Sequence, residues 1–466
     1  MKPNNYSKIY AIGDIHGDIM PLIICLRDCC KVIKKKEGYN YTQNEIDKDL
    51  DLNMLKKWDD STYVDDLNYT WIGEEASVVF CGDLLDNVRG PIYKKPQEYP
   101  FEEARIFKFI NSINKQAMKQ GGRIFKILGN HDMYNLNGET IKNYSTYVSQ
   151  YAKDYEGYKT DGATSRLDYF GKGKPGSKLI GEDGAHLFLM IRDFIFVHGG
   201  ISSSLLNVKN IHETNASLMD YIYDKNNNFN SDVDSIENQL TFSNDSDDGL
   251  VHDRFFGFKE NKSEDELCSV LYNRFKLLCK DMKEDMLLKT GDSFKNSLSC
   301  NPNKMKLVIG HCNQNKHTSD KGKIFEASFS KKTNINSLNG VNYSEEFSAP
   351  VYKGEPSVNK AIYGITVSCG DRDDNNNIDY DNPSIFRIDV GMSRGFNTEA
   401  YTEELAYSRT PQVLKIEYIN DKPVISIIKS TFENMKIHMK DLDVNPYEKK
   451  YIKYKTKYLT LKREKK

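Results

Sequence analysis

The sequence predicts an α/β fold whose first strands are parallel. Apolar runs at residues 8–12, 77–81 and 123–127 have the length of buried strands, and segments of helical periodicity separate them. The alternation of strand, helix, strand, helix and strand is typical of a mostly parallel sheet. A polar motif follows each of these strands, and the active sites of such folds lie beyond the carboxyl ends of the strands. The fold class therefore also predicts where a site would lie.

Two amphipathic helices connect these strands. Apolar residues recur at helical spacing from Ile19 to Ile33, and the lysine-rich end of this stretch suits the C-terminus of a helix. A second helix is expected over Phe101–Lys119, where the pair Gly121-Gly122 ends it.

The later part of the chain predicts a second sheet. Residues 186–190 and 194–197 form an expected hairpin, a helix is expected over Glu264–Met286, and residues 306–309 form a further strand. Paired strands are expected at 361–368 with 385–390, and at 413–418 with 423–428. We therefore expect two sheets, one begun by the N-terminal half and one completed by the C-terminal half.

Composition points to an ordinary core carrying polar insertions. The hydrophobic content of 38% is low for 466 residues, and the charged content of 28% is slightly high. The net charge of −2, from 65 basic and 67 acidic residues, gives no argument for a nucleic-acid or membrane partner. No apolar run approaches the ~20 residues of a membrane span, and the polar start leads directly into a strand without a signal peptide.

The nine cysteines indicate a reduced compartment. Their number is odd, no Cys-x-x-Cys pair occurs, and several lie in apolar patterns. We therefore expect reduced thiols rather than a disulfide framework, and a cytoplasmic protein.

Five predicted strands end in motifs of metal-ligating residue types. A Gly-Asp turn alone is common, so the signal is the series and not any one member. The motifs are Gly13-Asp14-Ile15-His16-Gly17-Asp18, Gly82-Asp83-Leu84-Leu85-Asp86, Gly129-Asn130-His131-Asp132, His198-Gly199-Gly200 and Gly310-His311.

This ligand set suits two divalent metal ions. Oxygen and imidazole ligands without thiolates favour Mn²⁺, with iron or zinc as alternatives. Two ions ~3.5–4 Å apart can share a bridging hydroxide that attacks a phosphoryl group, which requires one bridging carboxylate. Asp83 is the candidate bridge. The other candidate ligands are Asp14 and His16 for the first ion, and Asn130, His198 and His311 for the second.

His131 is the candidate general acid. It is adjacent to a proposed ligand, and Asp86 would hold its tautomer, so it can protonate a leaving oxygen. The alternative is that these residues are core histidines and turn aspartates. That reading would prevail for a single histidine, but five strand-end motifs in series favour a site.

The motif series resembles the calcineurin-like metallophosphoesterase superfamily. The fuller strings ILGNHDMYN, IFVHGGI, LVHDRFFG, VIGHCNQN and RIDVGMSRG resemble its phosphoprotein phosphatase branch, with the bacterial-type Shewanella-like phosphatases closest. The resemblance covers about residues 8–395, with unmatched insertions at 37–75, 210–245 and 316–358. It implies a ββ-sandwich flanked by helices within a catalytic domain over 1–430. It also implies dinuclear metal-dependent hydrolysis of phosphate monoesters, often on phosphoserine, phosphothreonine or phosphotyrosine proteins.

The same resemblance implies residues that bind the substrate phosphate. Arg254 matches the arginine of the family's W-x-R element, and Asn130 is shared with the metal site. The family's GDxxDRG is altered here, because Asn87 follows Asp86 and an arginine appears only at Arg89. The role of Arg89 therefore rests on a shifted spacing.

Two further functions are compatible with the motifs. The same site could hydrolyse a nucleotide or dinucleoside polyphosphate, and a non-catalytic phosphate-binding scaffold is the third reading. The third is disfavoured because every predicted ligand and the acid are present. The sequence offers no substrate-contact motif that separates the first two.

The C-terminal residues 431–466 form an expected basic helical tail. Tyrosines recur on one helical stripe of Tyr447–Lys466 among nine basic residues. A basic helix lying on the globule is favoured over a contact with nucleic acid or an anionic surface. The segment also resembles tails of large DNA virus proteins, which would place the chain in a host cytoplasm or a virion.

Overall fold

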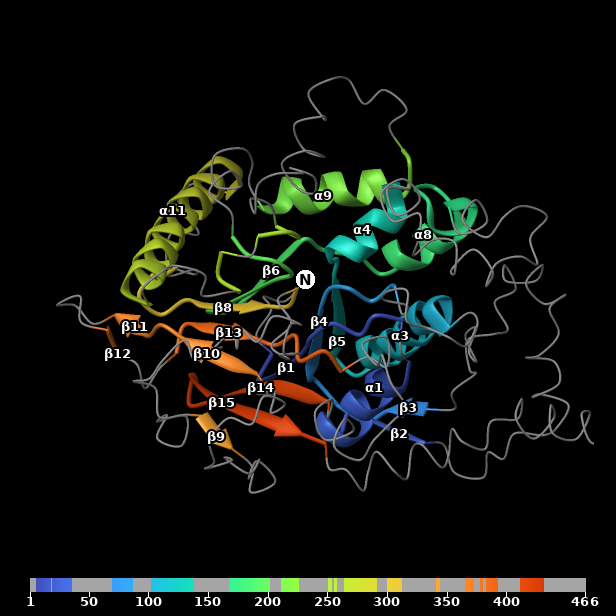
Figure 1. The fold of residues 1–466 in the computed structure, drawn as a ribbon, viewed down its shortest axis with the longest axis horizontal. Coiled ribbons are helices and arrows are strands. Elements are labelled where there is room, and N and C mark those ends of the chain that lie inside the picture. The colour runs from blue at the N-terminus through green and yellow to red at the C-terminus, as the bar shows by residue number, and fades with distance from the viewer. Residues whose placement is uncertain are drawn as a thin grey trace, which may run out of the picture.

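A computed structural model of the protein describes two β-sheets with helices outside them (Figure 1). The described residues are 6–17, 19–35, 69–86, 102–137, 167–201, 211–225, 250–253, 255–257, 264–290, 300–311, 341–343, 365–372, 378–379, 383–392 and 411–430.

The first sheet combines N-terminal parallel strands with a C-terminal hairpin. Its order is β5-β4-β1-β14-β15-β9. β1 runs parallel to β4, and β4 parallel to β5, whereas β14 pairs antiparallel with β1. The strands are β1 (Lys8–Ile12), β4 (Ser77–Cys81), β5 (Arg123–Ile127), β9 (Val341–Tyr343), β14 (Gln412–Ile419) and β15 (Lys422–Lys429).

The second sheet has the order β10-β13-β8-β7-β6. β7, β8 and β13 are parallel neighbours, and β6 and β10 close the two edges in antiparallel pairs. Its strands are β6 (Phe188–Ile191), β7 (Phe194–Val197), β8 (Lys306–Ile309), β10 (Thr366–Ser368) and β13 (Ile385–Arg387). Two small ribbons pair β2 (Ile33–Lys35) with β3 (Tyr69–Trp71), and β11 (Asp371–Arg372) with β12 (Ile378–Asp379).

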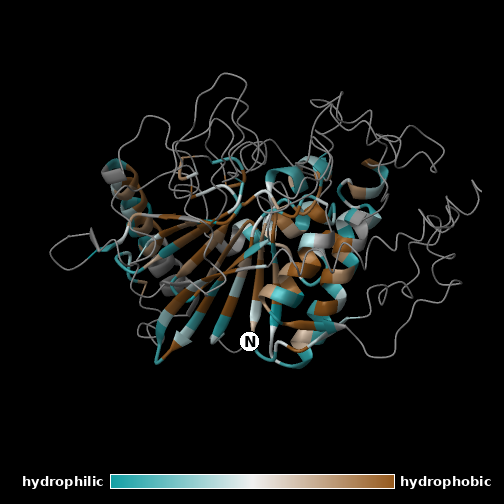
Figure 2. Cartoon of the chain, turned by 60° about the horizontal axis from the view of Figure 1, so that its bottom comes forward, coloured by the Kyte–Doolittle hydropathy of each residue, from teal (hydrophilic) through white to brown (hydrophobic). Residues whose placement is uncertain are grey.

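The two sheets share one hydrophobic core. Strands β4, β7 and β8 are buried along their whole length. Phe194 of β7 packs on Tyr418 of β14 with ring centroids 6.5 Å apart, so the sheets contact through side chains. In Figure 2 the apolar residues concentrate in the strands and on the helix sides that face them. The core therefore fixes the two sheets relative to each other.

Helices cover the outside of the sandwich. α1 (Ile19–Ile24) and α3 (Glu102–Lys119) lie together beside β4 and β5, and α11 (Glu264–Thr290) lies on the opposite flank near β8 (Figure 1). Above them are α4 (Asn130–Asn137), α8 (Pro175–Gly181) and α9 (Ile211–Ile222). None of the helices in the described ranges is both long and apolar enough to cross a bilayer.

The α/β class and the two-sheet arrangement are confirmed. The predicted helix before β5 and all three predicted strand pairs are present, with ends shifted by one to three residues in most cases. The exception is β10, which begins at Thr366 although a strand is predicted from residue 361, and residues 361–364 lie outside the described residues. The predicted insertions also contain structure: β3 lies in the first, α9 in the second, and β9 in the third, where it joins the edge of the first sheet. The tail 431–466 lies outside the described residues.

The first predicted helix is too long. α1 ends at Ile24, a π-helical turn follows over Cys25–Cys29, and Ile33 already belongs to β2, paired with Trp71. The amide of Cys30 donates to the carbonyl of Cys25, five residues back, which is the π-helical pattern. Periodicity could not show this end, because Ile33 is buried whether it is helical or extended.

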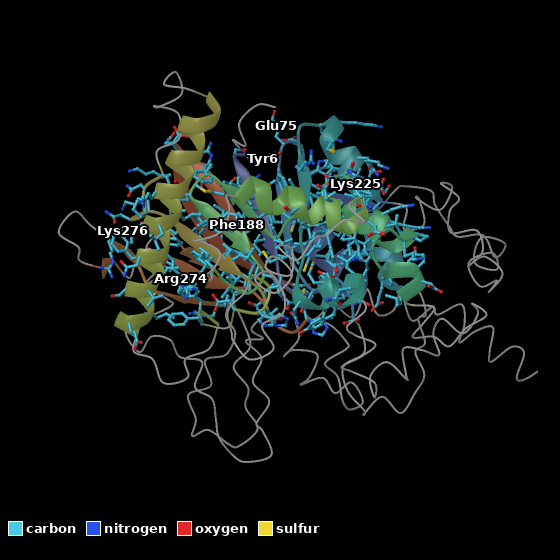
Figure 3. All side chains as sticks on the ribbon, turned by 90° about the horizontal axis from the view of Figure 1, so that it is seen from above. Tyr6, Glu75, Phe188, Lys225, Arg274 and Lys276 are labelled. Carbon is cyan, nitrogen blue, oxygen red and sulfur yellow. A yellow bond between two sulfur atoms is a disulfide. The ribbon has the colours of Figure 1, made fainter. Side chains whose placement is uncertain are left out.

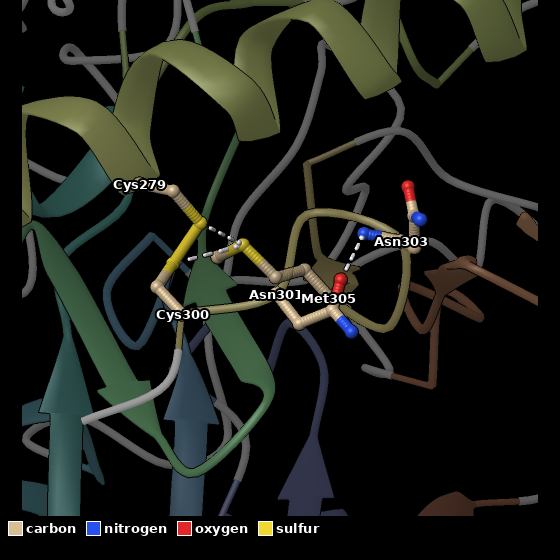
Figure 4. Close-up of a disulfide and its surroundings, with 5 residues drawn as sticks. All are labelled: Cys279, Cys300, Asn301, Asn303 and Met305. Atoms are coloured by element: carbon tan, nitrogen blue, oxygen red, sulfur yellow. Dashed lines mark hydrogen bonds between the residues drawn. A yellow bond between two sulfur atoms is a disulfide. The ribbon is translucent and has the colours of Figure 1, made fainter. Parts of the chain in front are cut away.

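The expectation of reduced thiols is wrong for four cysteines. Cys268 is bonded to Cys369, and Cys279 is bonded to Cys300. Figure 4 shows the bond between Cys279 and Cys300. The partners lie 101 and 21 residues apart in sequence, so no local spacing could indicate them. Both pairs attach α11 to segments beside the second sheet. The free cysteines in the described residues are Cys25, Cys29, Cys30 and Cys81, all buried.

Candidate metal centre

Five strand ends converge on one place in the structure. Because β1, β4 and β5 are parallel, their carboxyl ends lie at one edge of the first sheet. The carboxyl ends of the parallel strands β7 and β8 lie together at an edge of the second sheet. Turn backbones join them: the amides of Ile15 and His16 donate to the carbonyl of Asp83 at 3.1 and 2.8 Å. The predicted motifs therefore lie side by side although 297 residues separate Asp14 from His311.

Asp83 is the centre of this group. Its Oδ2 lies 3.7 Å from Nε2 of His16 and 3.4 Å from Nε2 of His198. Ligand atoms of Asp14, His16 and Asp83 lie within 4.8 Å of one another, and so do those of Asp83, His198 and His311. The two sets of three share only Asp83, which is the arrangement that a bridging carboxylate requires.

Backbone carbonyls fix the tautomers of two imidazoles. Nδ1 of His16 lies 3.2 Å from the carbonyl oxygen of Leu85, and Nδ1 of His198 lies 2.7 Å from that of Cys81. A carbonyl can only accept, so each Nδ1 carries a proton, and a neutral ring would present its Nε2 lone pair to a metal ion bound by the carboxylates. A metal-bound histidine usually donates its other ring N–H to a carbonyl in this way.

The converging atoms fit divalent cations. Nε2 of His198 faces Oδ1 of Asn130 at 3.0 Å and Oδ2 of Asp83 at 3.4 Å, so three lone-pair donors point at one region. Two ligands ~2.1 Å from one ion at a right angle lie about 3 Å apart, close to these separations. Asp14, His16, Asp83 and His198 are at most 1% exposed. The oxygen-and-imidazole set is hard to borderline, which suits Mn²⁺, Fe²⁺ or Zn²⁺.

Electrostatics in the centre favour ionised Asp83. Burial acts to raise the pKa of its carboxyl, but the imidazoles of His198, His131 and His16 hold that pKa well below its usual range. Burial lowers the pKa of His198, and the charge of Asp83 more than offsets this, so the pKa is raised. The negative charge of Asp83 is stabilised by positive charge beside it, and a bound cation would stabilise the same carboxylate.

Two glycines of the motifs make room for the carboxylates. A Cβ at Gly129 would lie 2.2 Å from Oδ1 of Asp83, and one at Gly310 would lie 2.4 Å from Oδ1 of Asp14. The same two oxygens accept backbone hydrogen bonds, Asp83 from the amide of His131 at 2.9 Å and Asp14 from that of His311 at 3.3 Å. Each carboxylate thus keeps its other oxygen directed at the imidazoles.

Four residues of the motifs adopt left-handed backbone conformations. His16, Asp83, Asp86 and His311 have φ angles of 44°, 48°, 67° and 58°. Non-glycine residues rarely adopt positive φ, and such conformations gather where a side chain must be aimed. The backbone conformation here is in keeping with a functional site rather than with plain turns.

His131 and Asp86 form a close pair at the margin of this centre. Nδ1 of His131 lies 2.6 Å from Oδ2 of Asp86, and the side-chain Nδ2 of Asn135 donates to Oδ1 of Asp86 at 3.0 Å. The His131 side chain is 20% exposed, whereas that of Asp86 is 5% exposed. The edge of the His131 ring meets the His16 ring with centroids 5.2 Å apart. The pair fixes Nδ1 as protonated and leaves Nε2 for a ligand.

Comparison with known families identifies the scaffold. The model of the family described as calcineurin-like phosphoesterase matches residues 7–265, which is more than half of the chain. The chain belongs to the calcineurin-like phosphoesterase family. Fold and motif geometry agree with this membership, and His311 lies beyond the matched residues yet joins the same centre.

Relatives of this calcineurin-like phosphoesterase include named phosphatases. The chain is 28% identical to Shewanella-like protein phosphatase 1 of Plasmodium berghei over 57% of this chain and 56% of the relative. It is 26% identical to Shewanella-like protein phosphatase 2 of Arabidopsis thaliana over 28% of this chain and 22% of that relative. An uncharacterised protein, R398, of Acanthamoeba polyphaga mimivirus is 30% identical to this chain over 20% of this chain and 37% of that protein. The chain thus spans about half or less of the curated relatives it matches.

Among solved structures, the crystal structure of a cold-active protein-tyrosine phosphatase of a psychrophilic Shewanella species resembles this chain. The alignment covers 90% of this chain and 81% of that one, with 15% sequence identity and a TM-score of 0.44.

The structure also gives a role to Asp132, the last residue of the third motif, which the sequence did not assign to the site chemistry. Asp132 accepts hydrogen bonds from the amides of Gly129, Leu84 and Leu85 at 2.9–3.0 Å, so it ties the second motif to the third. Burial and the charge of Asp83 raise the pKa of Asp132 to about 7.

Tyr134 and His252 are two further residues beside the centre that the sequence did not single out. The Tyr134 hydroxyl lies 2.8 Å from Nε2 of His252. Their sequence signals were present, since Tyr134 lies one helical turn after His131 and His252 precedes Arg254. Arg89 and Arg254 themselves lie outside the described residues.

Proposed function

We propose that the protein is a dinuclear metal-dependent phosphatase that hydrolyses phosphate monoesters, with phosphoserine, phosphothreonine or phosphotyrosine proteins as substrates. The observation that carries this proposal is the pair of ligand sets sharing Asp83 with the His131–Asp86 pair beside them. Family membership and relatives named as protein phosphatases support it. A hydrolase of this class needs both features, because one activates water and the other protonates the leaving group.

The chain's own residues would hold two metal ions. Asp14, His16 and Asp83 would bind the first, while Asp83, Asn130, His198 and His311 would bind the second. Such ions supply an activated water and polarise phosphoryl oxygens. We propose Mn²⁺ first, with iron or zinc as alternatives, since no thiolate is among the candidate ligands.

His131 would act on the leaving group. Its Nδ1 proton is held by Asp86, so the proton that it can give away is on Nε2, and Asp86 stabilises the imidazolium before transfer. Arg254 would bind the phosphate in a bidentate manner, with Asn130 and Arg89 as further contacts. If so, Arg254→Ala should lose more transition-state binding than Arg89→Ala.

The source of the protein and the location of its substrates are also proposals. The mimivirus relative supports a large DNA virus as the source, which would place the substrates in a host cytoplasm or a virion. We propose that the basic tail over 431–466 is a helix lying on the globule, outside the chemistry of the site.

A substrate screen tests the proposed function. The purified full chain is stripped with a chelator, reloaded with Mn²⁺, and assayed on phosphoserine, phosphothreonine and phosphotyrosine peptides, ATP and a dinucleoside polyphosphate. We expect release of phosphate from at least one phosphopeptide only after reloading, and none from Asp83→Asn. Hydrolysis confined to the nucleotides would replace the protein substrate by a nucleotide. No hydrolysis of any substrate by the reloaded chain would overturn the proposed activity.

A further inference from the structure

Tyr134 and His252 come from separate parts of the chain and meet beside the metal centre. Tyr134 lies on α4, and His252 lies in the turn at residues 250–253. The Tyr134 hydroxyl is 2.8 Å from Nε2 of His252, and the ring centroids are 5.4 Å apart. Tyr134 is buried, with 8% exposed, and His252 is partly exposed.

The pair spans the distance between the proposed acid and a proposed metal ligand. The Tyr134 ring meets the His131 ring with centroids 5.7 Å apart, and the His252 ring meets the His311 ring, also at 5.7 Å. Both contacts are edge-to-face, with interplanar angles of 77° and 88°. A polar pair therefore lies between the group that would protonate the leaving oxygen and the ligands that would hold the metals.

The turn that carries His252 is firmly fixed. The Asp253 side chain, 1% exposed, accepts from Arg274 of α11 at 3.0 Å and from the amide of Phe255 at 2.7 Å. The amide of Gly199, directly after His198, donates to the carbonyl of Leu250 at 2.7 Å. Figure 3 shows Arg274 on α11. His252 is thereby fixed relative to His198, and it can hold the Tyr134 hydroxyl in one place.

We propose that Tyr134 donates a hydrogen bond to a non-bridging oxygen of the phosphoryl group and that His252 positions it. The inference rests on the proposed phosphatase function. In a displacement at phosphorus the attacking and leaving oxygens are roughly in line, so the non-bridging oxygens point sideways. If the leaving oxygen is at His131 and the attacking oxygen at the metal ligands, a donor between His131 and His311 faces those sideways oxygens.

Counting hydrogens supports this assignment. The phenol and a neutral imidazole carry two polar hydrogens, and their mutual hydrogen bond uses one of them. With the proton of His252 on Nε2, that bond runs from the imidazole to the Tyr134 oxygen, and the phenol O–H is the group that would donate to a bound anion. A phenol that accepts from an imidazole is a stronger donor, because hydrogen bonds in a chain polarise one another.

Three variants of the full chain test the pair. Tyr134→Phe and His252→Phe keep the rings and remove the hydrogen bond, and the double variant removes both polar groups. Tyr10→Phe is the matched control, since that buried phenol lies on β1. Binding of inorganic phosphate and orthovanadate to Mn²⁺-loaded protein is measured by calorimetry. Rates are measured on a phosphoserine peptide and on nitrophenyl phosphate, with metal content checked in each variant.

The expected results follow from a donor to a charged oxygen. Each single variant should weaken orthovanadate binding by ~10- to 100-fold and lower kcat by a similar factor, with metal content unchanged. The factor should be equal for the two substrates, because charge on non-bridging oxygens does not depend on the leaving group. The double variant should lose no more than the single ones. Tyr10→Phe should behave as wild type.

Other outcomes would overturn the proposal. Unchanged orthovanadate affinity in Tyr134→Phe would show that its hydroxyl is structural. Losses that multiply in the double variant would show two independent groups, and a loss confined to the phosphoserine peptide would assign Tyr134 to the leaving group instead. If the wild-type chain binds orthovanadate but hydrolyses no substrate, the proposed phosphatase function is wrong. The orthovanadate affinities of the variants would then still test the role of Tyr134 and His252. A wild-type chain that binds neither anion overturns both.

Discussion

Side chains of the candidate metal centre are oriented by backbone atoms of neighbouring strand ends. The carbonyls of Leu85 and Cys81 accept from His16 and His198, and the amide of His131 donates to Asp83. The residue types of the motifs were predictable from sequence, because carboxylate, amide and imidazole ligands have a recognisable pattern. Their supporting partners were not, since every residue carries the same amide and carbonyl.

Replacing the proposed acid should affect substrates unequally. An alkyl leaving group such as the serine oxygen departs as a strongly basic alkoxide unless it is protonated, whereas nitrophenolate is stable as an anion. His131→Asn should therefore slow phosphoserine hydrolysis ~10²- to 10⁴-fold and nitrophenyl phosphate hydrolysis far less. Asp86→Asn should show the same bias more weakly, because it disturbs the imidazole without removing it.

His311→Ala is the control, since loss of a metal ligand should slow both substrates together. Rates of all three variants with metal content measured decide the matter. Equal slowing by His131→Asn would show that the residue is not the acid.

At the scale of elements, β5, α3 and α8 are joined around a buried lysine. Nζ of Lys126 in β5 donates to Oδ1 of Asn111 in α3 at 2.7 Å and to the carbonyl of Glu182, just after α8, at 2.6 Å. Burial lowers the pKa of Lys126 to about 7. The apolar pattern predicted β5 and α3, but a lysine in a strand gave no sign that it would be buried, because only the assembled helices provide its acceptors.

Lys126 should make stability depend on pH. Its folded pKa lies below the unfolded value of 10.5, so the unfolded chain binds more protons between about pH 7 and 10.5. The folded state therefore gains stability as pH rises through this window, by up to about 1.4 kcal/mol per pH unit.

The measurement is urea unfolding of wild type, Lys126→Met and Lys119→Met at pH 7, 8, 9 and 10. Lys119 is exposed at the end of α3 and serves as the control. As pH rises, the free energy of unfolding of wild type should increase relative to that of Lys126→Met. The difference in free energy of unfolding between wild type and Lys119→Met should not change with pH. A flat difference for Lys126→Met would contradict the lowered pKa.

For the whole molecule, α11 is attached to the second sheet at two points. Cys268 is bonded to Cys369 after β10, and Cys279 to Cys300 before β8. Between these points Arg274 reaches Asp253, so the flank also supports the turn beside the metal centre. Sequence predicted the α/β class and two sheets from periodicity, yet it missed this attachment because the partners are distant in the chain.

Removing the disulfides should destabilise the folded chain without removing the metal ligands. In the chain-entropy model a bond closing about 100 residues contributes about 4–5 kcal/mol, and one closing about 20 contributes about 3 kcal/mol. Cys268→Ser should therefore lower the urea midpoint more than Cys279→Ser. A reductant should lower the wild-type midpoint and leave that of a Cys268→Ser/Cys279→Ser variant unchanged. An unchanged wild-type midpoint would show that the bonds are not formed.

The central claim is that Asp83 bridges two metal ions bound by residues from both sheets. Anomalous diffraction from crystals of the Mn²⁺-loaded chain, collected at the manganese edge, tests it directly. We expect two peaks about 3.5–4 Å apart, one beside His16 and one beside His198, with Asp83 touching both. Crystals of Asp83→Asn should lose at least one peak. A single peak in the wild-type chain, or two peaks without Asp83 between them, would contradict the account.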